Sequence, residues 1–216
     1  MGTIKTTNIE PIADNGTVTL GSSGDTFTVP SGVTVNMSSA TQTGVGGTNK
    51  PCFQAYASGT LALTDSTYTT LAFNNDSGSD GSIIGYDEGG CYNDTSGTVT
   101  LNGISTPAYS FAPNVAGKYR LSSFFAIDST NNDLHLVLGR ISKNGNTTGG
   151  LYQFYWHKIP ASVALERQGL YLSAIVEANG TSDYFSITAY ADVGSGASTV
   201  FTTNNFAFFA GEKLII

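Results

Sequence analysis

The chain has 216 residues and a formal net charge of −7, with 40% hydrophobic but only 12% charged residues. Because an average soluble domain is about 25% charged, most of the polarity here comes from Ser, Thr, Asn and Gly. The nine basic residues are scattered, so the chain lacks the Lys and Arg cluster that nucleic-acid binding needs. No apolar run is long enough to span a bilayer, and the start has no export-signal pattern, so we expect no membrane insertion.

The first part of the chain consists of short runs in which apolar residues alternate with Thr. These runs are residues 16–20, 25–29 and 32–36, and Gly-Ser-Ser-Gly and Pro-Ser-Gly turns separate them. Period-two alternation predicts half-buried β-strands. A segment this small buries too little surface to fold alone, so it packs either on the rest of its own chain or with sister chains in a triangular β-prism. The residues pointing into such a prism would be Val18, Leu20, Phe27, Val29, Val33 and Val35.

A polar, glycine-rich stretch at residues 38–49 predicts a linker, which divides the chain into domains at 1–47 and 48–216. The second domain contains many β-rich runs: 52–56, 68–73, 98–101, 117–127, 133–143, 151–157, 169–177, 183–191 and 205–215. So many short strands with turn signals between them predict an all-β sandwich or jelly roll. The one helical candidate, residues 160–167, is too short to change that class.

The two cysteines, Cys52 and Cys91, are not part of a Cys-x-x-Cys pair or a Cys/His cluster. A zinc site is therefore not expected. Each cysteine is interpreted first as a small buried hydrophobe. A Cys52–Cys91 disulfide is the alternative, which a reducing cytoplasm would disfavour.

Four motifs in the second domain resemble the C1q/tumour-necrosis-factor superfamily. They are Lys50-Pro-Cys-Phe-Gln-Ala-Tyr56, Phe111-Ala-Pro-Asn-Val-Ala-Gly-Lys-Tyr119, Leu138-Gly-Arg-Ile-Ser-Lys-Asn-Gly145 and Asn204-Asn-Phe-Ala-Phe-Phe-Ala-Gly211. The resemblance spans about residues 50–214 and implies a ten-stranded jelly roll that assembles as a tight homotrimer. The sequence departs from the family pattern at Ala207 and Phe208, which replace a Ser-Gly pair, and in a long insertion at 76–106.

By analogy with that family, aromatic residues of the central strands line the threefold interface. Tyr119, Phe124 and Tyr190 are the candidates, and the alternative is that they fill the jelly-roll core. For Phe111 and Phe206 we expect a core position.

Residues 12–35 are similar to a module in structural proteins of marine tailed phages. That resemblance implies a virion protein, assembled in the host cytoplasm, whose N-terminal segment joins other virion proteins. The collagen-like Gly-X-Y stalk of animal C1q proteins is missing from these first residues.

Residues 74–94 form the longest interruption of the strand pattern and carry the candidate ligand site. The candidate residues are Asp76, Asp80, Tyr86, Asp87, Glu88 and Tyr92. Carboxylate oxygens in a flexible loop suit Ca²⁺, and tyrosines suit sugar stacking, so a host-surface glycan or protein is the expected ligand. We expect no other cofactor.

A catalytic function is not expected. Adjacent Asp87 and Glu88 point to opposite faces of an extended chain, so they do not form an acid and nucleophile pair. His135 and His157 are interpreted as structural or surface residues, and no hydrolase or phosphate-loop motif occurs.

The sequence therefore predicts a trimeric phage fibre or knob that presents a jelly roll for host attachment. A capsid decoration or cement protein that stabilises the shell is the main alternative, and a glycan-processing enzyme is a more distant one.

Overall fold

A computed structural model describes residues 19, 22–23, 25–35, 49–74, 85–146, 151–160, 163–202 and 206–215, without the side chains of 151–156. The chain divides into two units, Met1–Val45 and Gly46–Ile216.

In the N-terminal unit the described segment 25–35 is extended, and two turns bend the chain. The Asp25 amide donates to the Ser22 carbonyl at 3.0 Å, and the Val33 amide donates to the Pro30 carbonyl at 3.2 Å. None of the described residues of this unit belongs to a strand ladder. The described residues of the strands expected at 25–29 and 32–36 have no ladder partner among the described residues, and most of the run 16–20 lies outside them.

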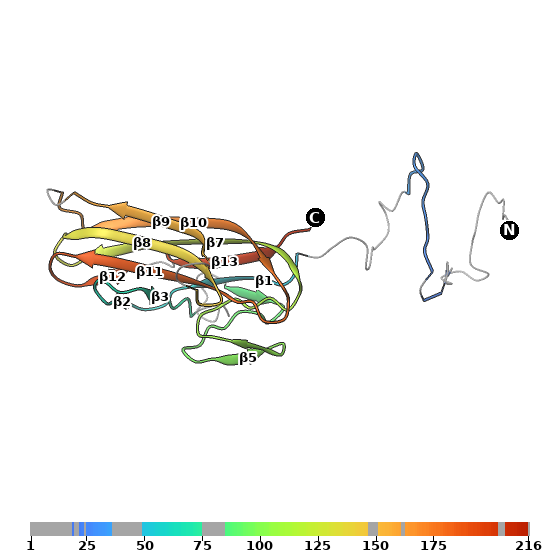
Figure 1. The fold of residues 1–216 in the computed structure, drawn as a ribbon, viewed down its shortest axis with the longest axis horizontal. Helices are drawn as coiled ribbons and strands as arrows, with labels where there is room; N and C mark the ends of the chain where they lie inside the picture. Colours follow the sequence, from blue (N-terminus) through green and yellow to red (C-terminus); the bar gives the residue numbers. More distant parts are fainter. Residues whose placement is uncertain are drawn as a thin grey trace. The chain divides into compact units, whose positions relative to one another are not determined.

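The larger sheet of the second unit has seven antiparallel strands (Figure 1). Their order is β2 (Leu61–Leu63), β12 (Ser198–Val200), β7 (Gly117–Ser129), β13 (Phe208–Lys213), β1 (Cys52–Tyr56) and β4 (Tyr86–Glu88), with β10 (Arg167–Ala178) also paired with β7. The smaller sheet has the order β3 (Thr69–Thr70), β11 (Phe185–Val193), β8 (Leu134–Lys143) and β9 (Leu151–Lys158).

The connections between the sheets make this unit a jelly roll. Along the chain β7 lies in the larger sheet, β8 and β9 in the smaller, β10 in the larger, β11 in the smaller and β13 in the larger. Successive crossings between two antiparallel sheets define the jelly-roll class. The all-β jelly roll expected for the second domain is confirmed. The helical candidate at 160–167 is not helical at any residue that the structure describes.

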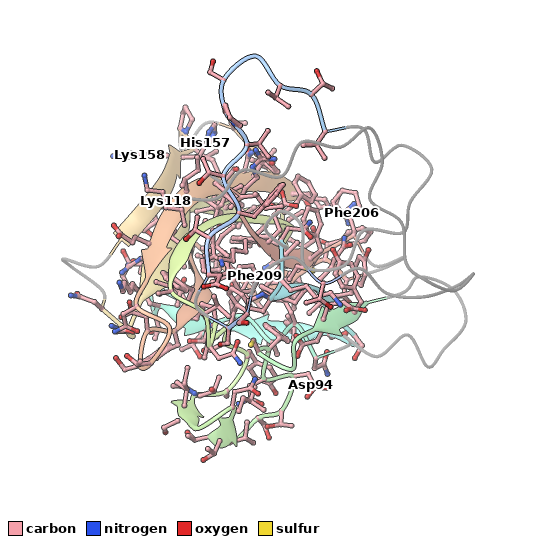
Figure 2. The ribbon with its side chains drawn as sticks, turned by 90° about the vertical axis from the view of Figure 1, so that its right-hand side faces the viewer. Asp94, Lys118, His157, Lys158, Phe206 and Phe209 are labelled. Atoms are coloured by element: carbon pink, nitrogen blue, oxygen red, sulfur yellow. The ribbon has the colours of Figure 1, made fainter. Side chains whose placement is uncertain are left out.

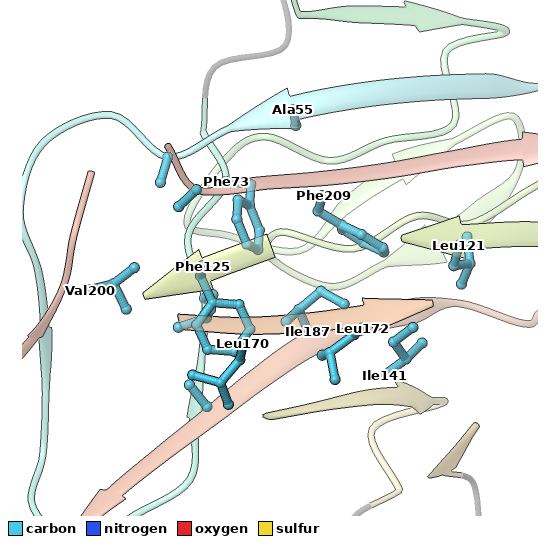
Figure 3. Packing of buried hydrophobic residues seen from close by; sticks show 14 of the residues in the cluster. Ala55, Phe73, Leu121, Phe125, Ile141, Leu170, Leu172, Ile187, Val200 and Phe209 are labelled. Carbon is cyan, nitrogen blue, oxygen red and sulfur yellow. The ribbon is translucent and has the colours of Figure 1, made fainter. Parts of the chain in front are cut away.

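The core lies between the two sheets (Figure 3). Phe125, Leu170 and Leu172 from the larger sheet meet Ile141 and Ile187 from the smaller sheet, and all five are fully buried. Strand alternation explains this, because every second residue of a strand faces the opposite sheet. Burying these side chains is the main stabilising term of the unit.

An aromatic group extends the core toward β1. The Phe53 ring stacks on Tyr92 with centroids 4.6 Å apart, on Phe111 at 4.5 Å, and meets the edge of Phe209 at 4.8 Å. Such arrangements add about 0.5–1.5 kcal/mol per pair beyond area burial. Phe111 is fully buried, as expected.

A separate hairpin, β5 (Val99–Leu101) and β6 (Ile104–Thr106), lies apart from both sheets (Figure 1). Its Asn102-Gly103 turn has positive φ angles of 49° and 81°, which the two-residue hairpin turn requires. The Asn102 amide donates to the carbonyls of Gly89 and Gly90, fastening the turn to the main chain.

Two backbone contacts mark the two ends of the jelly roll. At one end the Lys213 amide donates to the Asn49 carbonyl at 3.2 Å, and at the other the Thr130 amide donates to the Ala197 carbonyl at 3.0 Å. Strand β7 runs between these ends, since Tyr119 pairs with Lys213 and Ser129 with Ser198. The chain therefore enters β1 and leaves β13 at the same end.

Candidate interaction surface

The outer face of the larger sheet carries a row of four aromatic side chains. Tyr171 of β10 lies opposite Phe124 of β7, which lies opposite Phe208 of β13, which lies opposite Tyr56 of β1. These residues alternate with the buried residues of the same strands, so they point away from the core. Tyr171 is 57% exposed, Phe124 and Phe208 are partly buried, and Tyr56 is buried.

Further aromatic rings extend this row near the end of β7. Phe206 is 43% exposed and meets Phe124 edge to face at 4.9 Å and Phe201 at 5.3 Å. Figure 2 shows Phe206 near the periphery of the sandwich and Phe209 toward its centre. The core position expected for Phe206 is therefore wrong, because the chain before β13 turns this ring onto the outer face.

A charged clamp borders the aromatic rings. The Arg167 guanidinium lies 3.8 Å from the centre of the Phe201 ring and binds both carboxylate oxygens of Asp128, with Nη2 donating at 2.8 Å. The hydrogen bond to Asp128 raises the pKa of Arg167. A bidentate pair holds the guanidinium plane, so Arg167 is fixed over the ring.

The next row of the same face has smaller side chains, followed by a charged row. The row of smaller side chains runs across the paired strands β10, β7, β13 and β1 and ends at Tyr86 of β4. Its members are Ser173, Ser122, Ala210 and Gln54. A shallow depression of about 190 Å³ lies here, lined by Phe53, Tyr86, Arg120, Ser122, Ala210, Gly211 and Glu212. Beyond it the Arg120 guanidinium pairs with Glu212 at 3.4 Å.

This face is unlike the solvated face of a typical antiparallel sheet, where polar residues alternate with core residues. Tyr171 and Ile175 on β10 are 57% and 59% exposed. Exposed large apolar side chains gathered on one face mark interaction sites, and Tyr and Arg are enriched at their energetic centres. The only charged pair in the described middle of the face, Arg120 and Glu212, is internally compensated.

The described residues of the expected ligand site do not share one face of the chain. Asp76 and Asp80 lie outside the described residues. Tyr86 is 42% exposed at the edge of the larger sheet. Glu88 faces outward and pairs with Lys50, whereas Asp87 faces inward and accepts the amides of Cys91 and Tyr92, both at 3.0 Å. Burial raises the pKa of Asp87, and the two hydrogen bonds oppose that rise.

Tyr92 is only 3% exposed, so it is not available for a ligand. Its ring stacks on Phe53 and its hydroxyl donates to the Phe73 carbonyl at 2.8 Å. The expectation that Tyr92 contacts a ligand is wrong. The Asp87 carboxylate accepts the amides of Cys91 and Tyr92, and at this turn the Tyr92 ring enters the core.

The three candidate interface aromatics occupy three different environments. Tyr119 is fully buried and its hydroxyl donates to the Val115 carbonyl at 2.6 Å, so it belongs to the core alternative. Burial raises the pKa of its hydroxyl strongly. Phe124 lies on the outer face of the larger sheet. Tyr190 belongs to the smaller sheet and packs at 5.0 Å from Tyr68, so Phe124 and Tyr190 do not share a face.

One side-chain cluster superficially resembles a catalytic triad. Asp133 accepts the Ser195 hydroxyl at 2.9 Å and lies 3.0 Å from His135 Nε2. Asp133 lies between the other two, so the serine hydroxyl is not bonded to the imidazole that would have to act as its base. The cluster joins the loop before β8 to the loop after β11.

Both thiols are free, so no disulfide links Cys52 and Cys91. Cys91 is buried and Cys52 partly buried, and burial is the main cause that raises the pKa of each thiol. Among the described residues no three His, Cys, Asp or Glu side chains gather closely enough to hold a metal ion. Over the same residues, no helix has the length and apolar character needed to cross a membrane.

No family model matches the sequence, and no curated protein matches it. Among solved structures, the crystal structure of murine APRIL at pH 5.0 is similar over 76% of this chain and 98% of that chain, with 9% sequence identity and a TM-score of 0.47. The strand order of the chain itself establishes that residues 52–213 form a jelly roll.

Proposed function

We propose that the chain is a non-catalytic structural protein of a tailed-phage particle, a homotrimeric fibre or knob whose jelly roll attaches to a host surface. The observation that supports the proposed assembly is the outward aromatic row Tyr171, Phe124, Phe208 and Tyr56. A rigid apolar face of this kind gains free energy when a second protein surface covers it.

Self-association suits this face better than a small ligand does. The depression beside the row is shallow and small compared with pockets of about 300–1,000 Å³ that enclose small molecules. Stable protein interfaces bury about 800 Å² per partner, which several strands of a sheet can supply. The internal pairing of Arg120 with Glu212 leaves no net charge there to repel an identical copy.

Threefold rather than twofold assembly is inferred from the C1q/tumour-necrosis-factor-like motifs, above all Phe111-x-Pro-x-x-x-Gly-x-Tyr119. The virion location is inferred from the resemblance of residues 12–35 to phage structural proteins and from the low charge of the chain. Assembly would take place in the host cytoplasm, where Cys52 and Cys91 would remain reduced.

Attachment is assigned to loops, because rigid β-scaffolds carry variable binding chemistry there. The expected ligands are a glycan or protein, with Ca²⁺ as a candidate bridge: Tyr86 offers an exposed ring, and Asp76, Asp80 and Glu88 are the carboxylates of this stretch in the sequence. Three weak contacts on one trimer would reinforce one another through avidity.

Two measurements test the proposal. Sedimentation of the purified chain at micromolar concentration should give three copies, and a stable monomer would contradict it. The labelled trimer should bind host cells, with less binding after replacement of Asp76, Asp80 and Glu88 by Asn or Gln. A trimer that binds no cells but binds shells stripped of it would instead identify a capsid decoration protein.

A further inference from the structure

The N-terminal unit carries a second exposed apolar face. Phe27 is 71% exposed, Val33 is 58%, Val35 is 52% and Val29 is 37%. On each side of the Pro30–Val33 turn these apolar residues alternate with Thr, so each of the two short runs in segment 25–35 has one apolar and one polar side. We call this segment the arm.

The arm also has backbone groups available for pairing. Among the described residues, the backbone hydrogen bonds of the arm are the two that close the turns at Ser22–Asp25 and Pro30–Val33. The strand-like runs on either side of the Pro30 turn have no ladder partner within the part of the chain that the structure describes. An extended segment in this state is a template for β-pairing with another chain.

We propose that the arm pairs with the arms of the other two copies, so that Phe27, Val29, Val33 and Val35 of three chains form one small intermolecular β-core. This inference rests on the proposed homotrimer and adds a second assembly element to it. The polar side, with Thr26, Thr28 and Thr34, would face water.

Connectivity makes sister arms the expected partners. Residues 36–48 join the arm to Asn49, and three residues later the chain enters β1, whose outer side belongs to the proposed interface. A linker of this length spans at most about 45 Å. Three arms tethered at neighbouring points have millimolar effective concentrations for one another, so weak pairing between them is sufficient.

Composition permits three identical arms to meet. Asp25 is the only charged residue within 25–35, and its carboxylate accepts the Ser22 amide at 2.6 Å in the turn. The apolar side has no charge to bury. Valine, threonine and phenylalanine are also the residue types that favour paired strands.

Hydrogen exchange of the full chain tests the inference, with native mass measured on each sample. In the wild-type trimer, amides in the arm should exchange about tenfold or more slowly than in a free extended chain. Val33→Asp should abolish that protection, because it places three carboxylates in the shared core. Thr34→Asp adds the same charge on the polar side and should retain the protection.

The outcomes separate the arm from the jelly roll. A trimeric wild type with an unprotected arm would contradict the arm inference and leave the proposed trimer intact. At a concentration where native mass shows the Tyr171→Glu variant to be monomeric, its arm should be unprotected. If its arm stays protected in a monomer, the arm docks on its own chain and the inference is wrong. A monomeric wild type would overturn the trimer and the inference together.

Discussion

Tyr171 and Phe124 lie directly opposite each other on β10 and β7, and both point away from the core. If this pair is the centre of the trimer contact, Tyr171→Glu should place three carboxylates in a desolvated interface. We expect the dissociation constant to rise by at least ~30-fold, the equivalent of about 2 kcal/mol. Sedimentation over a concentration series measures the change, and circular dichroism checks that the fold is kept.

Val163→Glu is the matched control for that substitution. Val163 is 47% exposed but lies in the loop before β10, outside the strands that carry the aromatic row. It should leave the assembly state unchanged. Equal effects of the two variants would show that the outer face of the larger sheet is not the contact.

Tyr119→Phe tests the assignment of this residue to the core. The substitution removes the hydroxyl that donates to the Val115 carbonyl at 2.6 Å and leaves the buried ring in place. The free energy of unfolding should fall by about 0.5–1.5 kcal/mol, while the number of copies stays the same. Urea denaturation and native mass measure the two quantities, and a loss of assembly without a loss of stability would return Tyr119 to the interface.

Gly180 and Gly59 form a natural pair for a steric test, because their φ angles are +74° and +75°. A Cβ at Gly180 would lie 2.5 Å from the Ala116 nitrogen, whereas at Gly59 it would meet nothing within 4 Å. Both Ala variants incur about 1–2 kcal/mol of backbone strain. Gly180→Ala should cost about 1–3 kcal/mol more in thermal or urea unfolding, and equal costs would contradict the close approach.

Lys143 and Asp183 predict a pH-dependent contribution to stability. Burial pushes the pKa of Asp183 up, but hydrogen bonds from Lys143, Asn144 and the Asn179 amide outweigh it and lower the pKa overall. A carboxyl with a lowered folded pKa stabilises the fold above its unfolded value of about 3.9, and the contribution is lost as pH falls through the folded pKa.

Lys143→Met should therefore destabilise the protein by about 1–3 kcal/mol at pH 7, with the difference shrinking toward pH 3 as Asp183 becomes protonated. Lys158→Met, at an exposed position on β9, is the control and should have little effect at either pH. Unfolding curves at the two pH values give the comparison. A Lys143→Met effect that is the same at pH 7 and pH 3 would contradict the role of the ion pair.

The sequence predicted the long strands because alternation within a strand is a local property. The run 52–56 coincides with β1, and 117–127 lies within β7. Alternation over three residues is a weak signal: the run 98–101 contains β5, but no predicted run covers β2, β4, β6 or β12. Their pairing is set by longer neighbours, as when β12 joins β2 to β7.

The candidate site was less predictable, because alternation does not say which face of a strand packs against the core of its own chain and which face points outward. In β7 the adjacent residues Phe124 and Phe125 have the same side chain, yet Phe125 is buried and Phe124 faces outward. Only cross-strand register shows that Tyr171, Phe124 and Phe208 lie in one row. The sequence does predict that the adjacent residues Asp87 and Glu88 point to opposite faces of the chain. The register of β4 agrees with this prediction.

The shared end formed by Asn49 and Lys213 gives the jelly roll a fixed polarity. The turn between β7 and β8 lies at the remote end, roughly 40 Å along β7, and is held to the loop before β12 by Thr130 and Ala197. A peptide inserted between Asn131 and Asn132 would interrupt no ladder. That turn is accordingly a place where an epitope or fluorophore can be added without disturbing the strand pairing of the jelly roll.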